Sequence, residues 1–155
     1  MIKAELYMFN PFQIEKSTEQ EIADTYSNLQ ERIIEEPDTP FQVAQNIELY
    51  ANMSFLLGEV IARLVEQHDL LKTEISIEEN QALYSFRNQW KENNDERPPA
   101  MSFFEAMAKQ TVKNKYKELA HLGAKLTRFK RAFESLEQKQ NSLKYKAKAM
   151  EFESF

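Results

Sequence analysis

Residues 102–150 read SFFEAMAKQTVKNKYKELAHLGAKLTRFKRAFESLEQKQNSLKYKAKAM, and this stretch decides the fold. Alternate steps of three and four residues from Leu119 pick out a row of ten positions, nine of them apolar. Such spacing is typical of a helix packed along one face against another helix. Ser102 and Glu105 fit a capping box, so we expect one long helix over 102–150. The row consists of Leu119, Leu122, Leu126, Phe129, Phe133, Leu136, Gln140, Leu143, Ala147 and Met150.

Residues 40–92 carry a second row of the same spacing, with eight of its eleven positions apolar. Thr39 followed by Pro40 is typical of a helix start, so we expect a long helix over 40–92. Beyond Glu78 the apolar residues shift to another face, which leaves open whether the helix bends or restarts near Asn80. The row consists of Val43, Ile47, Tyr50, Ser54, Leu57, Ile61, Leu64, His68, Leu71, Ile75 and Glu78.

A shorter helix is predicted over 17–36, after a lead-in over 1–16. Ser17 and Gln20 fit a capping box, and apolar residues follow at helical spacing. Pro37, Pro40, Pro98 and Pro99 separate the three helices, because proline is poorly tolerated inside a helix. The prediction is therefore an all-α fold in one helical domain, 1–155.

Helix length suggests how the segments pack. Fifty helical residues span about 75 Å, whereas a compact chain of this size is only about 40 Å across. We therefore expect an elongated hairpin with coiled-coil-like packing, whose remaining apolar residues favour homo-oligomers. A compact bundle of broken helices is the alternative, since it shares the heptad spacing. The predicted core or oligomer seam consists of Leu57, Ile61, Leu64, His68, Leu71, Leu119, Leu126, Phe129, Phe133 and Leu136.

Composition argues against the common enzyme scaffolds. The 155 residues include no Cys, two His and two Gly that lie 65 positions apart. Cys-ligated zinc, a three-His metal centre and a glycine-rich phosphate loop are thereby excluded. Glu118 and His121 have the spacing used in di-iron bundles, but the second such pair is missing. We expect no enzyme, no catalytic residue, no metal and no cofactor.

The chain also carries no signal-peptide pattern and no apolar stretch of the roughly 20 residues that span a membrane. We therefore expect no membrane partner and a cytoplasmic location, which is the host cytoplasm if a phage encodes the protein.

Charge is distributed unevenly. Residues 1–100 contain 8 basic and 19 acidic side chains, whereas residues 101–150 contain 12 basic and 4 acidic ones. Such asymmetry suggests a segment that binds a polyanion, and aromatic rings between the cations favour single-stranded DNA. The predicted phosphate contacts are Lys115, Lys117, Lys125, Arg128, Lys130 and Arg131, and the predicted base-stacking residues are Tyr116 and Tyr145.

A second interpretation needs no nucleic acid. The cations flank both sides of the apolar row instead of forming one stripe, so the acidic segment can neutralise them within a helix pair. The chain is then a coiled-coil assembly or adaptor protein of a phage, with a structural or host-inhibitory role.

The basic segment resembles the C-terminal half of phage recombination mediators of the UvsY type, and the resemblance covers about residues 40–150. It rests on the capped helix start with Glu105 and Ala106, on Val112 followed by Tyr116, and on the basic, leucine-containing end around Leu143. The resemblance implies an oligomeric helical protein that binds single-stranded DNA and helps a recombinase to replace single-strand-binding protein. It implies no covalent chemistry.

Overall fold

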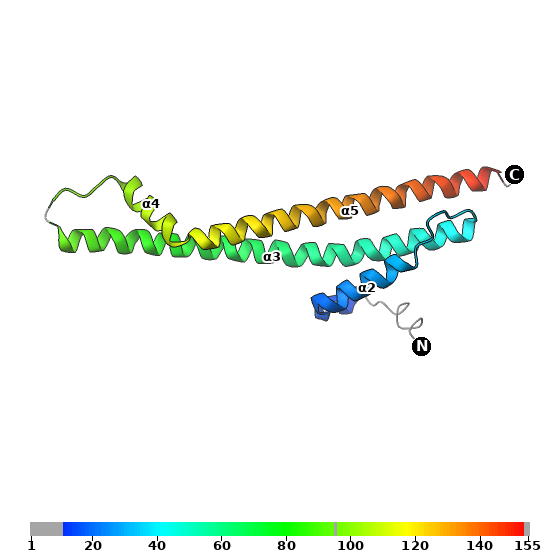
Figure 1. The fold of residues 1–155 in the computed structure, drawn as a ribbon, viewed down its shortest axis with the longest axis horizontal. Coiled ribbons are helices and arrows are strands. Elements are labelled where there is room, and N and C mark those ends of the chain that lie inside the picture. The colour runs from blue at the N-terminus through cyan, green and yellow to red at the C-terminus, as the bar shows by residue number, and fades with distance from the viewer. Residues whose placement is uncertain (1–10, 95, 154–155) are drawn as a thin grey trace. The chain divides into compact units, whose positions relative to one another are not determined.

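The computed structural model describes residues 11–94 and 96–153, and within them it contains four α-helices, one short 3-10 helix and no β-strand (Figure 1). The predicted all-α class is confirmed. Residues 1–10 of the predicted lead-in lie outside the described residues. The elements are η1 (Pro11–Lys16), α2 (Glu19–Glu31), α3 (Pro40–Asn93), α4 (Met101–Thr111) and α5 (Lys113–Glu153).

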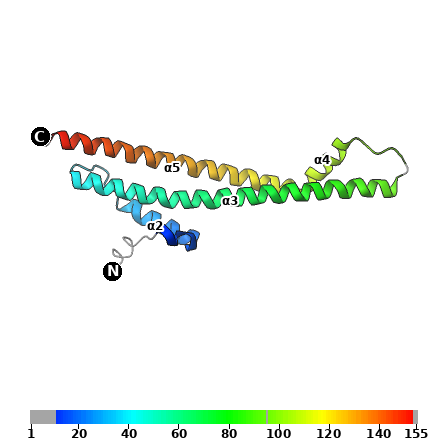
Figure 2. The same cartoon turned by 180° about the vertical axis from the view of Figure 1, so that it is seen from behind.

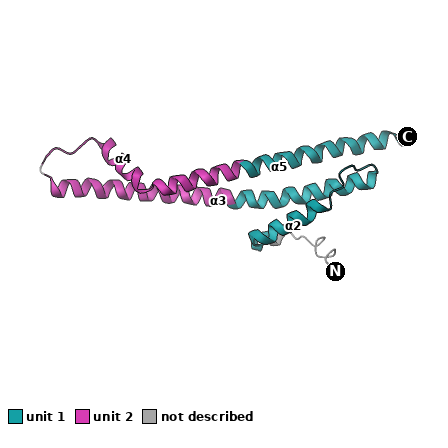
Figure 3. Cartoon of the chain, in the orientation of Figure 1, with its two compact units in different colours: residues 1–63, 128–155 teal, residues 64–127 magenta. Residues whose placement is uncertain are grey.

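The chain divides into two compact units (Figure 3). Unit 1 comprises Met1–Arg63 and Arg128–Phe155, and unit 2 comprises Leu64–Thr127. Each unit therefore contains part of α3 and part of α5, and each is described by itself below.

Helix α2 starts at Glu19, two residues later than predicted. Thr18 is its N-cap: the Thr18 Oγ1 accepts from the backbone N–H of Glu21 at 3.1 Å, and the Glu21 carboxylate accepts from the N–H of Thr18 at 3.2 Å. The predicted box of Ser17 and Gln20 is wrong, because the Gln20 side chain donates instead to Asp24 at 2.8 Å. The helix ends at Glu31, five residues before the predicted end.

Helix α3 begins at Pro40 as expected, and the Thr39 hydroxyl accepts from the backbone N–H of Gln42 at 3.2 Å. It runs for 54 residues and passes through Asn80 without a restart. The shift of apolar residues after Glu78 has another cause, since Trp90 lies edge-on against Phe104 of α4, with ring centroids 6.5 Å apart.

The single helix expected over 102–150 is two helices, separated at Val112. This residue has φ −104° and ψ 16° and is only 1% exposed, packed with Leu71 and Ile75. The predicted cap of Ser102 and Glu105 is also wrong, because α4 begins at Met101 and has no side-chain cap. Its N-cap is Ala100, which has φ −57° and ψ 149°, so the helix starts one residue before Ser102.

Unit 1 has the larger core. Helix α2 and the last part of α5 both lie along the first part of α3, in the view of Figure 1 and from behind in Figure 2. Asn46, 1% exposed, joins the turn after α2 to α3: its side chain accepts from the N–H of Ile34 at 3.0 Å and donates to the carbonyl of Ile34 at 2.7 Å. The buried cluster consists of Ile14, Ile22, Leu29, Leu49, Met53, Leu56, Leu57 and Leu136.

Unit 2 has a smaller core. Leu71, Ile75 and Val112 form its buried cluster, and Leu119 and Leu122 pack against it half-buried. Phe104 and Ala108 of α4 are buried as well.

The apolar row of α5 consists entirely of buried or half-buried residues, and Lys115 and Gly123 are the other residues of 113–153 that are not exposed. Leu136 is the buried member, and Leu119, Leu126, Phe129 and Phe133 are half-buried. The predicted seam residues of α3 behave similarly: Leu57, Leu64 and Leu71 are buried, and Ile61 and His68 are half-buried.

Candidate nucleic-acid interface

Two of the predicted DNA contacts are already engaged within unit 2. The Lys115 ammonium bonds to the Glu74 carboxylate at 2.6 Å and also to that of Glu78, while the Tyr116 hydroxyl donates to Glu79 at 2.6 Å. The bonds to Glu74 and Glu78 raise the pKa of Lys115, and the bond to Glu79 raises the pKa of Tyr116. Because two carboxylates neutralise the Lys115 charge, this residue is poorly suited to a phosphate contact.

The Tyr116 ring, in contrast, stays accessible while its hydroxyl is held. The side chain is 39% exposed and borders a hollow of about 390 Å³ on α4 and α5. Its lining is basic, with three lysines around one aromatic ring. The residues that line it are Lys109, Gln110, Lys113, Tyr116, Lys117 and Ala120.

The lysines of this hollow follow one another at intervals of four. Lys109 lies in the last turn of α4, Lys113 begins α5, and Lys117 lies one turn further along. All three are exposed, and none forms a side-chain hydrogen bond or ion pair with the described residues. Sequence reasoning singled out Lys117 but missed Lys109 and Lys113 as site residues, although the interval of four was a usable signal.

The remaining predicted cations lie further along α5. Lys125 is exposed in unit 2, and Arg128, Lys130 and Arg131 are exposed in unit 1. Within residues 11–94 and 96–153 these four side chains have no hydrogen-bond or ion-pair partner. Their charges are therefore available to an external anion.

Tyr145 is 73% exposed but does not join the Arg128–Arg131 group. It lies 14 residues beyond Arg131, which corresponds to about 21 Å along a helix. Two lysines of the same part of α5 form contacts within unit 1. Lys146 donates to the Pro37 carbonyl, and the Lys139 ammonium lies 5.9 Å from the Tyr50 ring centroid. The structure thus groups the predicted site residues into separate clusters.

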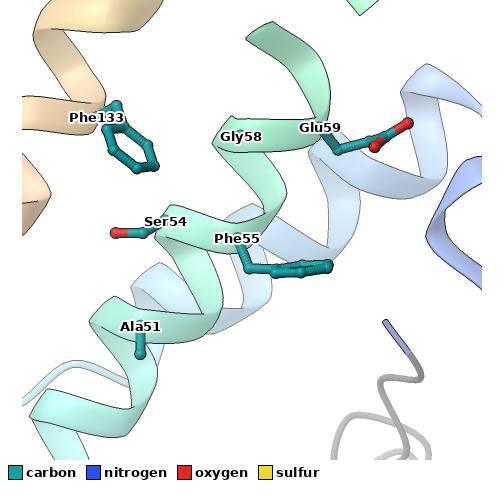
Figure 4. A pocket seen from close by; sticks show the side chains of 6 residues that line it. All are labelled: Ala51, Ser54, Phe55, Gly58, Glu59 and Phe133. Atoms are coloured by element: carbon teal, nitrogen blue, oxygen red, sulfur yellow. The ribbon is translucent and has the colours of Figure 1, made fainter. Parts of the chain in front are cut away.

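A second hollow, of about 410 Å³, lies in unit 1 and has a different character (Figure 4). Ala51, Ser54, Phe55 and Gly58 of α3 line it together with Phe133 of α5. Its one charged lining residue is Glu59, whose carboxylate accepts from Arg63 at 3.0 Å. A mostly apolar lining with a carboxylate does not suit an anion, so we do not assign this hollow to the candidate nucleic-acid interface.

Among the described residues, no three His, Asp or Glu side chains are grouped closely enough to hold a metal ion. Within the same residues, no helix combines the length and the apolar character that crossing a bilayer requires. Comparison of the chain with protein-family models, curated proteins and solved structures finds no match.

Proposed function

We propose that this protein is a single-stranded DNA-binding accessory protein of the recombination-mediator type, which helps a recombinase to load. The observation that carries the proposal is the hollow in which Lys109, Lys113 and Lys117 surround the Tyr116 ring. Lysines bind backbone phosphates as point charges, and an aromatic ring stacks on a base of any sequence. Cations around an accessible ring are the combination that single-strand binding uses.

The bond between Tyr116 and Glu79 strengthens this interpretation. A ring whose hydroxyl is fixed at 2.6 Å loses less conformational freedom when a base stacks on it. Stacking of one base on an aromatic side chain contributes about 1–3 kcal/mol in such proteins. Because a duplex hides the faces of its bases, this contribution favours a single strand.

The exposed cations further along α5 extend the electrostatic contribution. Lys125, Arg128, Lys130 and Arg131 have no partner among the described residues, so each is able to displace a counterion from the strand. The proposal retains the expected coiled-coil pairing of the long helices and the expected self-assembly. It also retains a recombinase and a single-strand-binding protein as partners, and a cytoplasmic location. These features come from the resemblance and from the heptad pattern.

The test is fluorescence anisotropy with a labelled oligothymidine across a salt series. Replacing Lys109, Lys113 and Lys117 together with Ala should reduce the slope of log affinity against log salt by about 2, at roughly 0.7 for each lost contact. Tyr116→Ala should weaken binding by about 5- to 150-fold, whereas Tyr116→Phe should retain most of the affinity.

The matched control replaces three other surface cations, Lys72, Lys91 and Arg97, with Ala. It changes the net charge equally but lies outside the hollow, so it should leave the salt slope nearly unchanged. Equal losses in both triple variants, or binding without any salt slope, would contradict the proposal. Preference for duplex over single-stranded DNA would contradict the stacking role of Tyr116.

A phage assembly or adaptor protein without a nucleic-acid role is the second candidate. The observation that favours it is Lys115, whose ion pairs with Glu74 and Glu78 show acidic α3 neutralising part of basic α5. The two candidates differ in the effect of Arg131→Glu, which changes an exposed charge without breaking any ion pair with the described residues. DNA affinity should fall in the first case and stay the same in the second.

A further inference from the structure

One face of α3 in unit 2 carries exposed apolar residues at regular spacing. Leu70 is 64% exposed, Ile77 is 53% exposed and Tyr84 is 62% exposed. They are seven residues apart, which is close to two helical turns, so their side chains project from the same face. Three exposed apolar residues aligned on one helix face, with the polar residues Thr73 and Asn80 between them, make that face a candidate contact surface.

We propose that this row is a self-association face, on which a second copy of the chain packs its own α3 in the antiparallel direction. The row is symmetric about Ile77, since Leu70 and Tyr84 each lie seven residues from it. A two-fold axis at Ile77 places Ile77 against Ile77 of the second copy. The same axis places Leu70 against Tyr84 twice, as an isologous interface requires.

The charges on this face favour a second copy of the chain as the partner and antiparallel packing of the two α3 helices. Glu66 lies eleven residues before Ile77, and Arg87 lies ten residues after it. Antiparallel packing therefore brings each Glu66 to within one residue, about 1.5 Å along the axis, of the level of Arg87 in the other copy. Neither side chain has an ion-pair partner among the described residues, so two reciprocal pairs are able to form.

Parallel packing would have the opposite electrostatic result. It places Glu66 beside Glu66 and Arg87 beside Arg87, and like charges at close range are destabilising.

Three apolar residues on each copy make an interface below the usual size of about 800 Å² per partner, so the association should be reversible and concentration-dependent.

Cysteine cross-linking tests the geometry, because the natural sequence contains no Cys. Under mild oxidation Ile77→Cys should give a covalent dimer, since the two-fold axis brings this position next to itself. Leu70→Cys alone should give little dimer, but a mixture with Tyr84→Cys should cross-link. Ser76→Cys is the control: it is exposed and adjacent in sequence, but about 100° around the helix.

Two results would overturn the geometry. Efficient self-cross-linking of Leu70→Cys would mean parallel packing, and equal dimer yields from Ile77→Cys and Ser76→Cys would mean random collision.

Sedimentation velocity across a concentration series tests the energetics. Ile77→Glu should weaken self-association by roughly 10- to 100-fold, because an apolar contact is replaced by two facing carboxylates. Ser76→Glu adds the same charge outside the row and should have little effect. Glu66→Arg and Arg87→Glu should each weaken dimers, and the two changes combined should restore them.

A wild-type chain that stays monomeric at all concentrations would overturn the proposal, and so would an Ile77→Glu variant that associates normally. Loss of dimers in the combined charge variant would refute the Glu66–Arg87 pairing. Far-ultraviolet circular dichroism confirms that each variant remains helical, which separates lost association from lost folding.

Discussion

The two units use the same spacing on α3 with opposite results. In unit 1, Leu49 and Leu56 lie seven residues apart and are 3% and 1% exposed, because they pack into the core with residues of α2. In unit 2, Leu70 and Ile77 continue the same interval but are 64% and 53% exposed. The difference shows that an apolar row on a long helix becomes core only where another element covers it.

Arg63 marks the change between the two kinds of surface. It occupies the position between Leu56 and Leu70 in the seven-residue series, and its guanidinium donates to the Ile14 carbonyl at 3.0 Å. The donor satisfies a carbonyl of the short helix η1, where that helix adjoins α3. Arg63 is also the last residue of α3 in unit 1, so the buried part of the series lies within that unit.

The sharpest test of this comparison is truncation of one leucine in each unit. Leu56→Ala should lower the free energy of unfolding by about 2–5 kcal/mol, because it removes a fully buried side chain. Leu70→Ala should change it by less than about 0.5 kcal/mol, as is usual for exposed positions. Urea denaturation followed by circular dichroism, at low protein concentration, measures both. Equal losses would show that Leu70 is covered within the monomer.

A smaller effect is expected at the buried amide of unit 1. Asn46→Ala leaves the N–H and the carbonyl of Ile34 without their partners, which should cost about 1–3 kcal/mol. Asn80→Ala is the matched change on exposed α3 in unit 2 and should be close to neutral. Denaturant midpoints of the two variants check the difference. A neutral Asn46→Ala would mean that water replaces the amide.

The polar contacts of unit 2 predict a dependence on alkaline pH. The folded state raises the pKa of Lys115 through its bonds to Glu74 and Glu78, so this contribution to stability is fully present below the ordinary lysine pKa. It is lost as the pH rises through the raised pKa. The wild type should therefore lose more stability above about pH 10 than Lys115→Met. Thermal melts at neutral and alkaline pH measure this, and identical losses would exclude the ion pairs as the cause.

The smallest expected effect separates two tyrosines whose pKa values are raised for different reasons. In unit 1, burial and then the nearby Tyr50 raise the pKa of Tyr26, whereas in unit 2 the bond to Glu79 raises the pKa of Tyr116. Glu79→Ala should lower the pKa of Tyr116 and leave that of Tyr26 unchanged. Ring resonances of labelled tyrosine, followed by nuclear magnetic resonance during an alkaline titration, resolve the two residues. A shift of both would contradict these causes.

Much of the local structure follows from short-range rules. The start of α3 at Pro40 and the low exposure of the α5 row follow from capping chemistry and heptad spacing, which depend on neighbours in sequence. The break at Val112 was not predictable in this way. That residue leaves the helical conformation where it is buried with Leu71 and Ile75, which are remote in sequence.

The candidate site was likewise predictable from the sequence only in part. The cations and tyrosines were recognisable as a class, but no local pattern distinguished Lys115 from Lys117. The structure separates them, because Lys115 meets two carboxylates of α3 while Lys117 borders the hollow beside Tyr116. Lys109, near the end of α4, and Lys113, the first residue of α5, border the same hollow.

The sequence alone determined that this chain is helical, where its longest helix starts, and that 12 of its 20 basic residues lie in residues 101–150. These properties depend on backbone propensity, capping and composition, which act within a few residues. Only the tertiary structure decided which charges are neutralised and which apolar residues are covered. Those outcomes depend on side chains of α3 and α5 that lie some forty positions apart, as Lys115 and Glu74 do, and no local pattern encodes such a contact.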